Sequence, residues 1–394
     1  MTPPLPLEEA QARLLDQVEP LPPETLGVVA ALGRWLTAPI IARRTQPWAD
    51  LSSMDGYATS GEGPWTIVGE SAAGVPFANV VRNGEAVKIS TGAALPVGAD
   101  AIVILEDASA EGNRLAASDK SASAAYIRRE GFDFRRGDCL LDRGERIGAA
   151  RLALAVSGGI EAVEVGRLPS VAIIDTGDEL KRGPADDRPD ALPASNGAML
   201  AALLSPLASS IARVGPVADD LGKLAAALTS VEASDVVITT GGASVGEHDL
   251  VRPALEACGA RIEYWRVAIK PGKPLLVARR DRQWIVGLPG NPASAYVTAI
   301  LFVLPLLRRL ASAPTDAAVP VFEPASLVSN LPAGGPRREF VRGILKAGRV
   351  QPIDERDSSA LLALASANCL IDRASLAAPA KAGDQVSIIR LPDT

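Results

Sequence analysis

Cysteine and histidine are scarce in this 394-residue chain. Its three cysteines, Cys139, Cys258 and Cys369, lie far apart without a CxxC pair, and His248 is the sole histidine. A disulfide framework and a structural zinc site both need more of these residues at closer spacing, so the sequence disfavours both. Because sparse, unpaired thiols fit a reducing compartment, we expect a cytoplasmic protein whose cysteines are structural.

Positive charge and long hydrophobic runs are also limited. The formal net charge is −6, which disfavours a nucleic-acid-binding protein with a broad basic surface. The most apolar run, Ala299–Leu307, is about half a membrane span and contains Pro305, so we predict a buried helix there. Glu8 and Glu9 precede every Lys and Arg, unlike the basic start of a secretory leader. We therefore expect neither nucleic acid nor a membrane among the partners.

The remaining composition supports packed cores, with 47% hydrophobic and 22% charged residues. At about 150 residues per domain, the length predicts two to four domains. Helical spacing in residues 5–18 gives way to short β-like segments with turns such as Asn83-Gly84, then to alternating strands and helices, and finally to short β segments again. We predict a discontinuous N-terminal α+β domain, an inserted mostly-β domain, an α/β domain and a small C-terminal β domain, a β-barrel or a sandwich, of which we favour the β-barrel. Their predicted ranges are residues 1–47 with 145–167, residues 48–144, residues 168–315 and residues 316–394.

The α/β region alternates apolar strands with helices, which favours a parallel-rich sheet covered on both faces. The predicted strands are Val171–Asp175, one ending at Val214, Asp235–Thr240, Ile262–Ile269, Leu275–Ala278 and Trp284–Leu288. The predicted helices are Gly197–Leu207, Leu221–Leu228 and Ala293–Leu310.

Four of these predicted strands are followed by residues suited to ligand binding. In open α/β sheets, ligands bind beyond the carboxyl ends of the strands, and adjacent glycines let backbone N–H groups approach a phosphate. Each segment alone is more often a tight turn. Their convergence on one sheet edge favours a site, since turns require neither lysines nor carboxylates. The segments are Thr176–Glu179, Thr240–Asp249, Lys270–Pro274 and Gly287–Pro292.

Lysine is rare, with 8 residues against 32 arginines, yet Lys270 and Lys273 lie three residues apart between prolines. An exposed surface pair is the common alternative. The strand-like residues on both sides favour a stiff turn that presents two compact cations, which suit phosphate or another oxyanion.

The chain resembles the MoeA/gephyrin E-domain family over nearly its whole length. The likeness rests on six motifs in the family's order: Ser53–Ala58 (SMDGYA), Ile89–Asp100 (ISTGAALPVGAD), Val171–Leu180 (VAIIDTGDEL), Thr239–Asp249 (TTGGASVGEHD), Ile269–Pro274 (IKPGKP) and Gly287–Pro292 (GLPGNP). It implies that the α/β domain has a three-layer, MogA-like fold. It also implies a homodimer with the active site at the subunit interface.

The activity implied by the resemblance is that of a molybdopterin molybdenumtransferase. Such an enzyme inserts molybdate into adenylylated molybdopterin with Mg²⁺, releases AMP and the molybdenum cofactor, and is expected to contact the pathway's adenylyltransferase. Two alternatives stay open: a molybdopterin adenylyltransferase, which SMDGYA and Ile127–Asp133 (IRREGFD) disfavour, and a non-enzymatic gephyrin-like scaffold. The choice between molybdenum and tungsten also stays open, because their oxyanions share charge and shape.

The resemblance also implies the site residues. The expected catalytic residues are Asp55, Glu179, Asp249, Lys270 and Lys273, with Asp249 and Glu179 as candidate Mg²⁺ ligands. The separate roles of Glu179, Asp249 and the neighbouring Asp178 stay open. For molybdate, the candidates are Lys270, Lys273 and Arg128, followed by Arg337 and Ser358. We interpret His248 as a bystander. The expected ligand-binding residues are Thr91, Arg128, Asp133, Asp219, Thr240, Gly241, Gly242, Ser244, Pro289, Pro292, Arg337 and Ser358, with Arg342 a further match.

Overall fold

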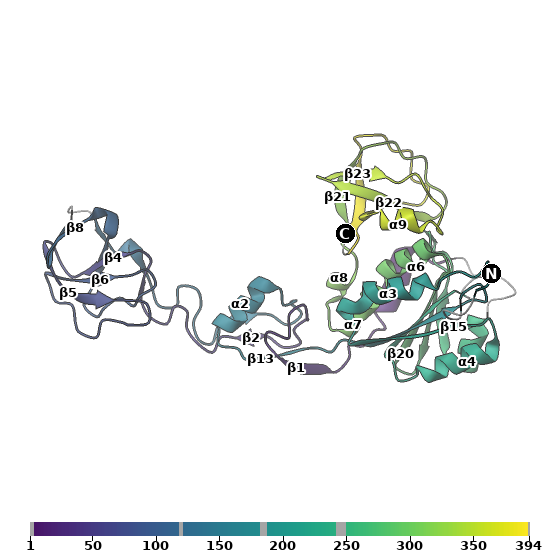
Figure 1. Cartoon of the computed structure of the whole chain (residues 1–394), viewed down its shortest axis with the longest axis horizontal. Helices are drawn as coiled ribbons and strands as arrows, with labels where there is room; N and C mark the ends of the chain where they lie inside the picture. Colours follow the sequence, from purple (N-terminus) through teal and green to yellow (C-terminus); the bar gives the residue numbers. More distant parts are fainter. Residues whose placement is uncertain (1–3, 118–120, 182–186, 242–249, 393–394) are drawn as a thin grey trace. The chain divides into compact units, whose positions relative to one another are not determined.

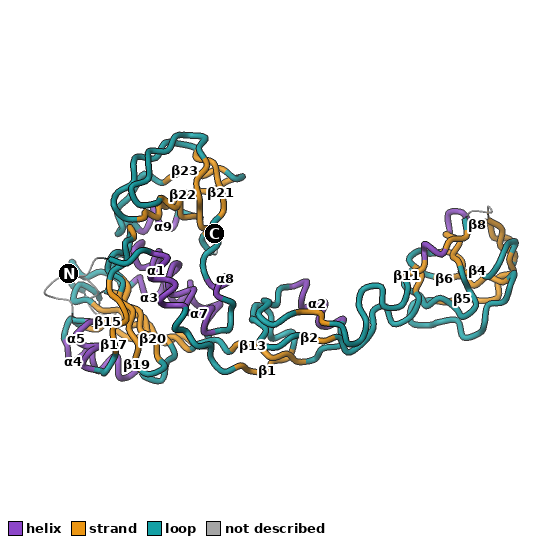
Figure 2. The backbone as a smooth tube through the Cα atoms, turned by 180° about the vertical axis from the view of Figure 1, so that it is seen from behind, coloured by secondary structure: helices purple, strands orange, loops and turns teal. Residues whose placement is uncertain are grey.

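The computed structural model describes residues 4–117, 121–181, 187–241 and 250–392, and the chain forms two compact units (Figure 1, Figure 2). The first unit comprises Met1–Glu24 and Val165–Thr394, and the second comprises Thr25–Glu164. Each unit is described by itself below.

A six-stranded sheet forms the centre of the first unit, in the order β15-β14-β16-β20-β19-β17. The first four strands are parallel, and β19 runs antiparallel to both of its neighbours. Every residue of β16 and β20 is buried, as expected for central strands with both faces covered. The predicted parallel-rich sheet is confirmed. The strands are β14 (Ser170–Thr176), β15 (Ser210–Val217), β16 (Val236–Thr240), β17 (Arg261–Trp265), β19 (Leu276–Arg280) and β20 (Gln283–Leu288).

Helices cover both faces of this sheet (Figure 1). Helices α4 (Leu221–Ser230) and α5 (Val251–Ala257) pack on one face in a core that includes Ala172 and Ile174 of β14. Alternate residues of a strand point to opposite faces, so Val171 and Ile173 point towards the other face. The helices on that side are α1 (Leu7–Leu15), α3 (Ser195–Leu204), α6 (Pro292–Thr298) and α7 (Leu304–Leu310).

The predicted buried helix near Pro305 is confirmed. It joins α6 and α7 through a π-helical segment, Ala299–Val303. Pro305 has no N–H for the carbonyl of Leu301 four residues earlier, and the Gln11 side-chain amide donates to that carbonyl instead, at 2.8 Å. By length and composition, Pro292–Leu310 passes as a membrane span, but 83% of its apolar window is buried inside the structure. It is packed as a core helix.

The C-terminal part of the first unit is a closed five-stranded barrel, as predicted. Its order is β22-β23-β21-β25-β24, and β24 pairs back onto β22. A short strand, β18 (Ile269–Lys270), adds to β22 in parallel. The prediction of one strand over Ile262–Ile269 is therefore wrong: β17 ends at Trp265, and Arg266 has φ of +80°, outside the extended region. Helix α8 (Thr315–Ala318) precedes the barrel strands in sequence, and α9 (Leu361–Ala365) lies between β23 and β24. The barrel strands are β21 (Glu323–Leu327), β22 (Arg338–Lys346), β23 (Arg349–Pro352), β24 (Cys369–Arg373) and β25 (Gln385–Arg390).

The second unit is mostly β, and residues 48–144, predicted as an inserted mostly-β domain, contain its main sheet. Its main sheet has seven strands in the order β10-β7-β4-β6-β5-β9-β8, and short pairs form between β1 and β13, β2 and β12, and β3 and β11. The main-sheet strands are β4 (Gly56–Thr59), β5 (Trp65–Ser71), β6 (Glu85–Ile89), β7 (Ala101–Ile104), β8 (Ala108–Glu111), β9 (Arg114–Ala117) and β10 (Ala122–Ser123). The paired segments are β1 (Pro23–Gly27), β2 (Ile40–Ile41), β3 (Leu51–Ser52), β11 (Ile127–Arg128), β12 (Cys139–Leu141) and β13 (Ala162–Gly166), and the unit's α-helix is α2 (Ala149–Ser157).

Candidate functional site

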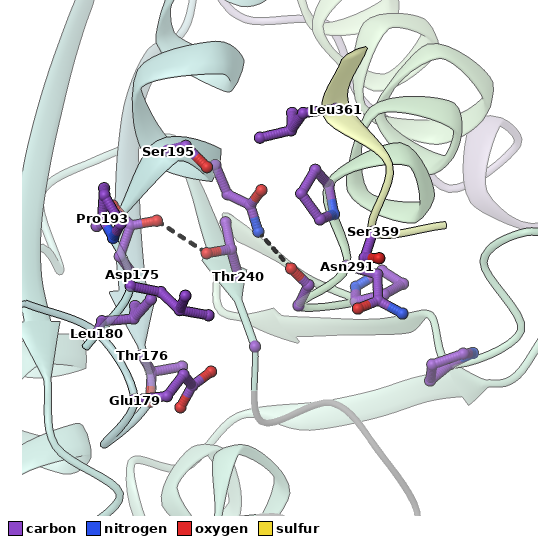
Figure 3. A pocket seen from close by; sticks show the side chains of 18 residues that line it. Asp175, Thr176, Glu179, Leu180, Pro193, Ser195, Thr240, Asn291, Ser359 and Leu361 are labelled. Carbon is purple, nitrogen blue, oxygen red and sulfur yellow. Dashed lines mark hydrogen bonds between the residues drawn. The ribbon is translucent and has the colours of Figure 1, made fainter. Parts of the chain in front are cut away.

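A cavity of about 710 Å³ lies where β14, β16 and β20 end, and we call it the acceptor cavity. Figure 3 shows Asp175, Thr176 and Glu179 at one part of it and Ser359 and Leu361, from the C-terminal region, at another. These three strands are parallel neighbours, so their carboxyl ends meet at one edge, where α/β proteins bind ligands. The predicted residues that line it are Glu179, Thr240, Gly241, Pro289 and Pro292.

Buried hydrogen bonds fix the wall of the acceptor cavity. The Asp175 carboxylate, 3% exposed, accepts from Thr240 Oγ1 at 2.8 Å (Figure 3). It also accepts from Gly197 N at 2.9 Å. Arg213 lies 3.6 Å from its second oxygen. The Asn196 side-chain amide donates to Gly290 O at 2.7 Å. The start of α3 is thereby tied to the ends of β14 and β20.

Gly241 allows the strand ends to approach this closely. Its φ is +94°, a region that other residues rarely adopt, and a Cβ there would lie 2.4 Å from Thr176 O. Only glycine fits without moving the backbone. The predicted glycine turn after β16 therefore has a structural requirement at its first position.

A second cavity of about 340 Å³ adjoins the first, and we call it the cationic cavity. It shares Pro274, Pro289 and Asn291 with the acceptor cavity. Five cationic side chains and the Glu339 carboxylate line it, in a chain whose net charge is −6. It therefore concentrates positive charge locally, as an oxyanion site requires. The cations are Lys270, Lys273, Arg337, Arg342 and Arg356.

The lysine turn reaches this edge by a route that differs from the prediction. Lys270 ends β18, which belongs to the barrel rather than to the α/β sheet. The turn nevertheless lies at the carboxyl edge because β19 is antiparallel, so its first residue, Leu276, pairs with Gly287 near the end of β20. Gly272 has φ of +105°, and a Cβ there would lie 2.5 Å from the Thr298 methyl group, so the turn packs closely on α6.

The cations of the second cavity differ in their partners. Lys270 Nζ lies 3.2 Å from Glu339 Oε1, and Arg337 Nη1 donates to Ile269 O at 3.3 Å. Within residues 250–392 and the other described ranges, Lys273 is exposed and has no side-chain partner. Of the two predicted lysines, Lys273 therefore has the charge left for an incoming anion.

Ser358 is held at the junction of the two cavities. Its hydroxyl accepts from Asn291 Nδ2 at 2.8 Å, and its carbonyl accepts from Ala293 N at 3.0 Å. The buried Arg342 guanidinium donates to the carbonyls of Glu355, Asp357 and Ala360, at 2.7, 2.9 and 3.1 Å. The loop that carries Ser358 is thus held in place by hydrogen bonds from Arg342 and from the turn that contains Asn291 and Ala293.

Next to Ser358, hydrogen bonds from the Ser359 N–H and hydroxyl hold the pKa of the Asp357 carboxyl below its usual value. A charged Asp357 therefore closes the turn that follows Ser358.

Other predicted site residues lie elsewhere. Asp219 accepts from Thr176 Oγ1 at 3.0 Å, just behind the acceptor cavity. Asp55 and Thr91 meet in the second unit, where Asp55 Oδ1 accepts from Thr91 N at 2.7 Å. Arg128, in β11, and Asp133 are exposed in the same unit. Gly242, Ser244, His248 and Asp249 lie outside the described residues.

Three contributors escaped the sequence reasoning: Asp175, Asn196 and Arg356. Asp175 carried a usable signal, since an ionisable residue that ends a buried apolar strand needs partners. Asn196 directly precedes the predicted helix start, but α3 begins at Ser195. No local pattern marks Arg356, which reaches the cationic cavity only because the barrel folds against α6.

Few of the carboxylates near the two cavities are available to bind a metal ion. Across the four described ranges, no group of three or more His, Cys, Asp or Glu side chains is placed to hold a metal ion. Mg²⁺ does not require such a group, because it keeps several waters and binds through one or two carboxylates and substrate phosphates. Asp175 and Asp219 already accept hydrogen bonds, which leaves the exposed Glu179 as the carboxylate that fits this role.

Fold and cavities together define a multidomain α/β protein with two adjoining cavities at the carboxyl edge of its sheet, one of them rich in cations. Family comparisons match residues 5–159 to the MoeA N-terminal region (domain I and II), residues 172–309 to a probable molybdopterin binding domain, and residues 324–391 to the MoeA C-terminal region (domain IV).

Relatives match at full length. The chain is 32% identical to a molybdopterin molybdenumtransferase of Haemophilus influenzae, over 98% of both chains. It is 30% identical to that of Staphylococcus aureus, over 98% of this chain and 95% of the relative. A crystal structure of a molybdopterin biosynthesis MoeA protein from Pyrococcus horikoshii aligns over 100% of both chains, with 27% identity and a TM-score of 0.81. The chain belongs to the molybdopterin molybdenumtransferase (MoeA) family, which confirms the resemblance seen in its motifs.

Proposed function

We propose that this protein is a transferase that inserts molybdenum, supplied as molybdate, into adenylylated molybdopterin and releases AMP and the molybdenum cofactor. The observation that carries the proposal is the pair of adjoining cavities that share Pro274, Pro289 and Asn291. One has the size of an organic ligand site, and the other is rich in cations. The relatives from Haemophilus influenzae and Staphylococcus aureus are named molybdopterin molybdenumtransferases, which supports a pterin ligand and a molybdenum donor.

The residues of each cavity have separate tasks in this proposal. Cleavage of a phosphoanhydride depends on positioning and on neutralising negative charge. The backbone at Gly241 and the hydroxyl groups of Thr176 and Thr240 line the acceptor cavity, where they would position the adenylylated ligand. Lys273, Arg337 and Ser358 would hold molybdate in the cationic cavity, since compact cations and hydroxyl donors suit a tetrahedral dianion.

Magnesium fits as an ion shared between protein and substrate. Glu179, with Asp249 from the undescribed segment, would bind it together with phosphate oxygens of the ligand. When bound, the ion would neutralise negative charge on the phosphate oxygens. We also propose a cytoplasmic homodimer in which Asp55, Thr91, Arg128 and Asp133 of one subunit serve the site of its partner, with contact to the adenylyltransferase that supplies the substrate.

AMP release tests the proposal. Purified protein with adenylylated molybdopterin and Mg²⁺ should release AMP only after molybdate is added. Lys273→Ala should raise the half-saturating molybdate concentration about tenfold or more, because it removes one close charge from the anion site. Lys346→Ala removes the same charge from an exposed position of β22 outside both cavities and should change nothing.

Two results would contradict the proposal. AMP release that does not depend on molybdate would contradict the proposed molybdenum insertion. Production of adenylylated molybdopterin from ATP and molybdopterin by the same protein would favour the adenylyltransferase alternative instead.

A further inference from the structure

Asn196 has a buried oxygen without a partner at the wall of the acceptor cavity. The residue is 9% exposed and lines the cavity. Its Nδ2 donates to Gly290 O at 2.7 Å, and a carbonyl can accept only from the nitrogen end of the amide. The orientation of the amide is therefore settled. Its Oδ1 is the end left over, and it has no hydrogen-bond partner in the described part of the chain.

Such an oxygen calls for a donor, because buried polar atoms in native proteins nearly always have partners. Thr239 Oγ1 and Tyr264 Oη are also buried without a partner, yet neither residue lines the acceptor cavity. Of these three oxygens, that of Asn196 belongs to a residue that lines the cavity. The hydrogen bond from Nδ2 to Gly290 O fixes the position of the side-chain amide, as a binding group requires.

The surrounding side chains narrow the class of ligand. Asn196 Oδ1 can only accept a hydrogen bond, and the carboxylates of Asp175 and Glu179 line the same cavity. A heterocycle bound there must present N–H groups. The 2-amino-4-oxo edge of a pterin carries an amino group next to a ring N–H, two adjacent donors. The adenine amino group is flanked by acceptor nitrogens, which would face other acceptors at an unfavourable cost.

We infer that Asn196 is a specificity-determining residue whose Oδ1 accepts a hydrogen bond from the aminopyrimidinone edge of the pterin. The inference rests on the proposed function, because it assigns the pterin half of the substrate to the acceptor cavity. A site built to receive a substrate N–H discriminates strongly against ligands that lack it. Asn196 thereby selects for the pterin half and is indifferent to the adenylate half.

Binding titrations under anaerobic conditions test this assignment, with adenylylated molybdopterin and AMP as separate ligands. Asn196→Leu keeps the approximate size of the side chain and removes the acceptor. It should weaken adenylylated molybdopterin about tenfold to a hundredfold and leave AMP affinity within about twofold. Thr239→Val is the matched control, since it removes a buried unpartnered oxygen outside the cavity, and both affinities should stay unchanged.

Each other outcome is decisive. Unchanged binding of adenylylated molybdopterin by Asn196→Leu would overturn the inference. Equal weakening of AMP would show that Asn196 serves the adenylate or merely holds the Gly290 turn, and would overturn it too. Failure of the unsubstituted protein to bind adenylylated molybdopterin would instead refute the proposed function. If thermal unfolding shows that Asn196→Leu does not fold, Asn196→Ser, which shortens the side chain without adding apolar volume, takes the same test.

Discussion

The acceptor cavity and the cationic cavity share an edge of one sheet but are assembled differently. The acceptor cavity is formed mainly by the ends of three neighbouring parallel strands and the start of α3. The cationic cavity lies between the α/β domain and the barrel, with Lys273 on one side and Arg337 and Arg356 on the other. The acceptor cavity receives Ser359 and Leu361 from the C-terminal region, whereas the cationic cavity depends more strongly on how the two domains pack. We therefore expect some substitutions to affect one cavity more than the other.

Charge separates the cavities as clearly as architecture does. The carboxylates of Asp175 and Glu179 line the acceptor cavity, and five cations line the cationic cavity. Both occur in a chain whose net charge is −6. Bulk charge therefore says little about either site, because each ligand interacts mainly with groups within a Debye length.

The largest effect is expected from Arg342, which braces the cationic cavity from inside the barrel. Arg342→Met would leave the carbonyls of Glu355, Asp357 and Ala360 without their shared donor. Since buried unpaired acceptors are costly, the free energy of unfolding should fall by about 2–4 kcal/mol. Because Ser358 lies in the same loop, the half-saturating molybdate concentration should also rise. Denaturant titration and the AMP-release assay measure the two effects.

Arg342→Lys is the control for charge. It keeps a cation but cannot donate to three carbonyls from a planar fork, so it should recover only a small part of the lost stability. Full recovery would mean that charge, rather than the bracing of the loop, is what matters. An unchanged affinity for AMP in both variants would show that the acceptor cavity is independent of the barrel loop.

The same contrast explains what the sequence revealed about the fold and the site. Strand ends with Thr-Gly pairs and GLPGNP could be placed at one edge, because parallel strands share their direction and the sheet was predictable from its apolar runs. The lysine turn was placed at the correct edge for the wrong reason, since β18 pairs with the barrel. Arg356 was missed, because packing between distant segments leaves no periodic pattern in the chain.

Buried polar residues were the other omission. Asp175 and Asn196 look like ordinary ends of a strand and a helix in the sequence. Their importance follows from the partners that tertiary structure brings to them, Thr240 and Gly290. Capping and turn residues are common at such positions, so composition alone could not separate a structural amide from one that faces a ligand.

A smaller effect is expected from Asp175, which joins the strand ends of the acceptor cavity. Asp175→Asn keeps the shape of the side chain but removes the negative charge of the carboxylate. One carboxylate oxygen accepts from Thr240 Oγ1 and Gly197 N, and the other faces Arg213. The free energy of unfolding should fall by about 1–3 kcal/mol. Affinity for adenylylated molybdopterin should fall with it, while molybdate dependence should change less, as the two cavities have different supports.

Asp16→Asn is the matched control for Asp175, since Asp16 is exposed at the end of α1 and its substitution should shift stability by no more than about 0.5 kcal/mol. If Asp175→Asn instead weakened the binding of molybdate and of adenylylated molybdopterin equally, the two cavities would depend on the same structural support.

The smallest effect is expected from the cysteines, none of which lines either cavity. Cys139 is exposed and should be alkylated first, whereas Cys369 is buried, and burial raises the pKa of its thiol to about 11. Since the thiolate is the reactive form, about one Cys369 in a thousand is reactive at pH 8 even before access is considered. Alkylation of the native protein should therefore leave AMP release intact while mass spectrometry shows Cys139 modified. Inactivation that parallels modification of a single thiol would place that cysteine in the mechanism. It would contradict the assignment of the activity to the residues of the two cavities alone.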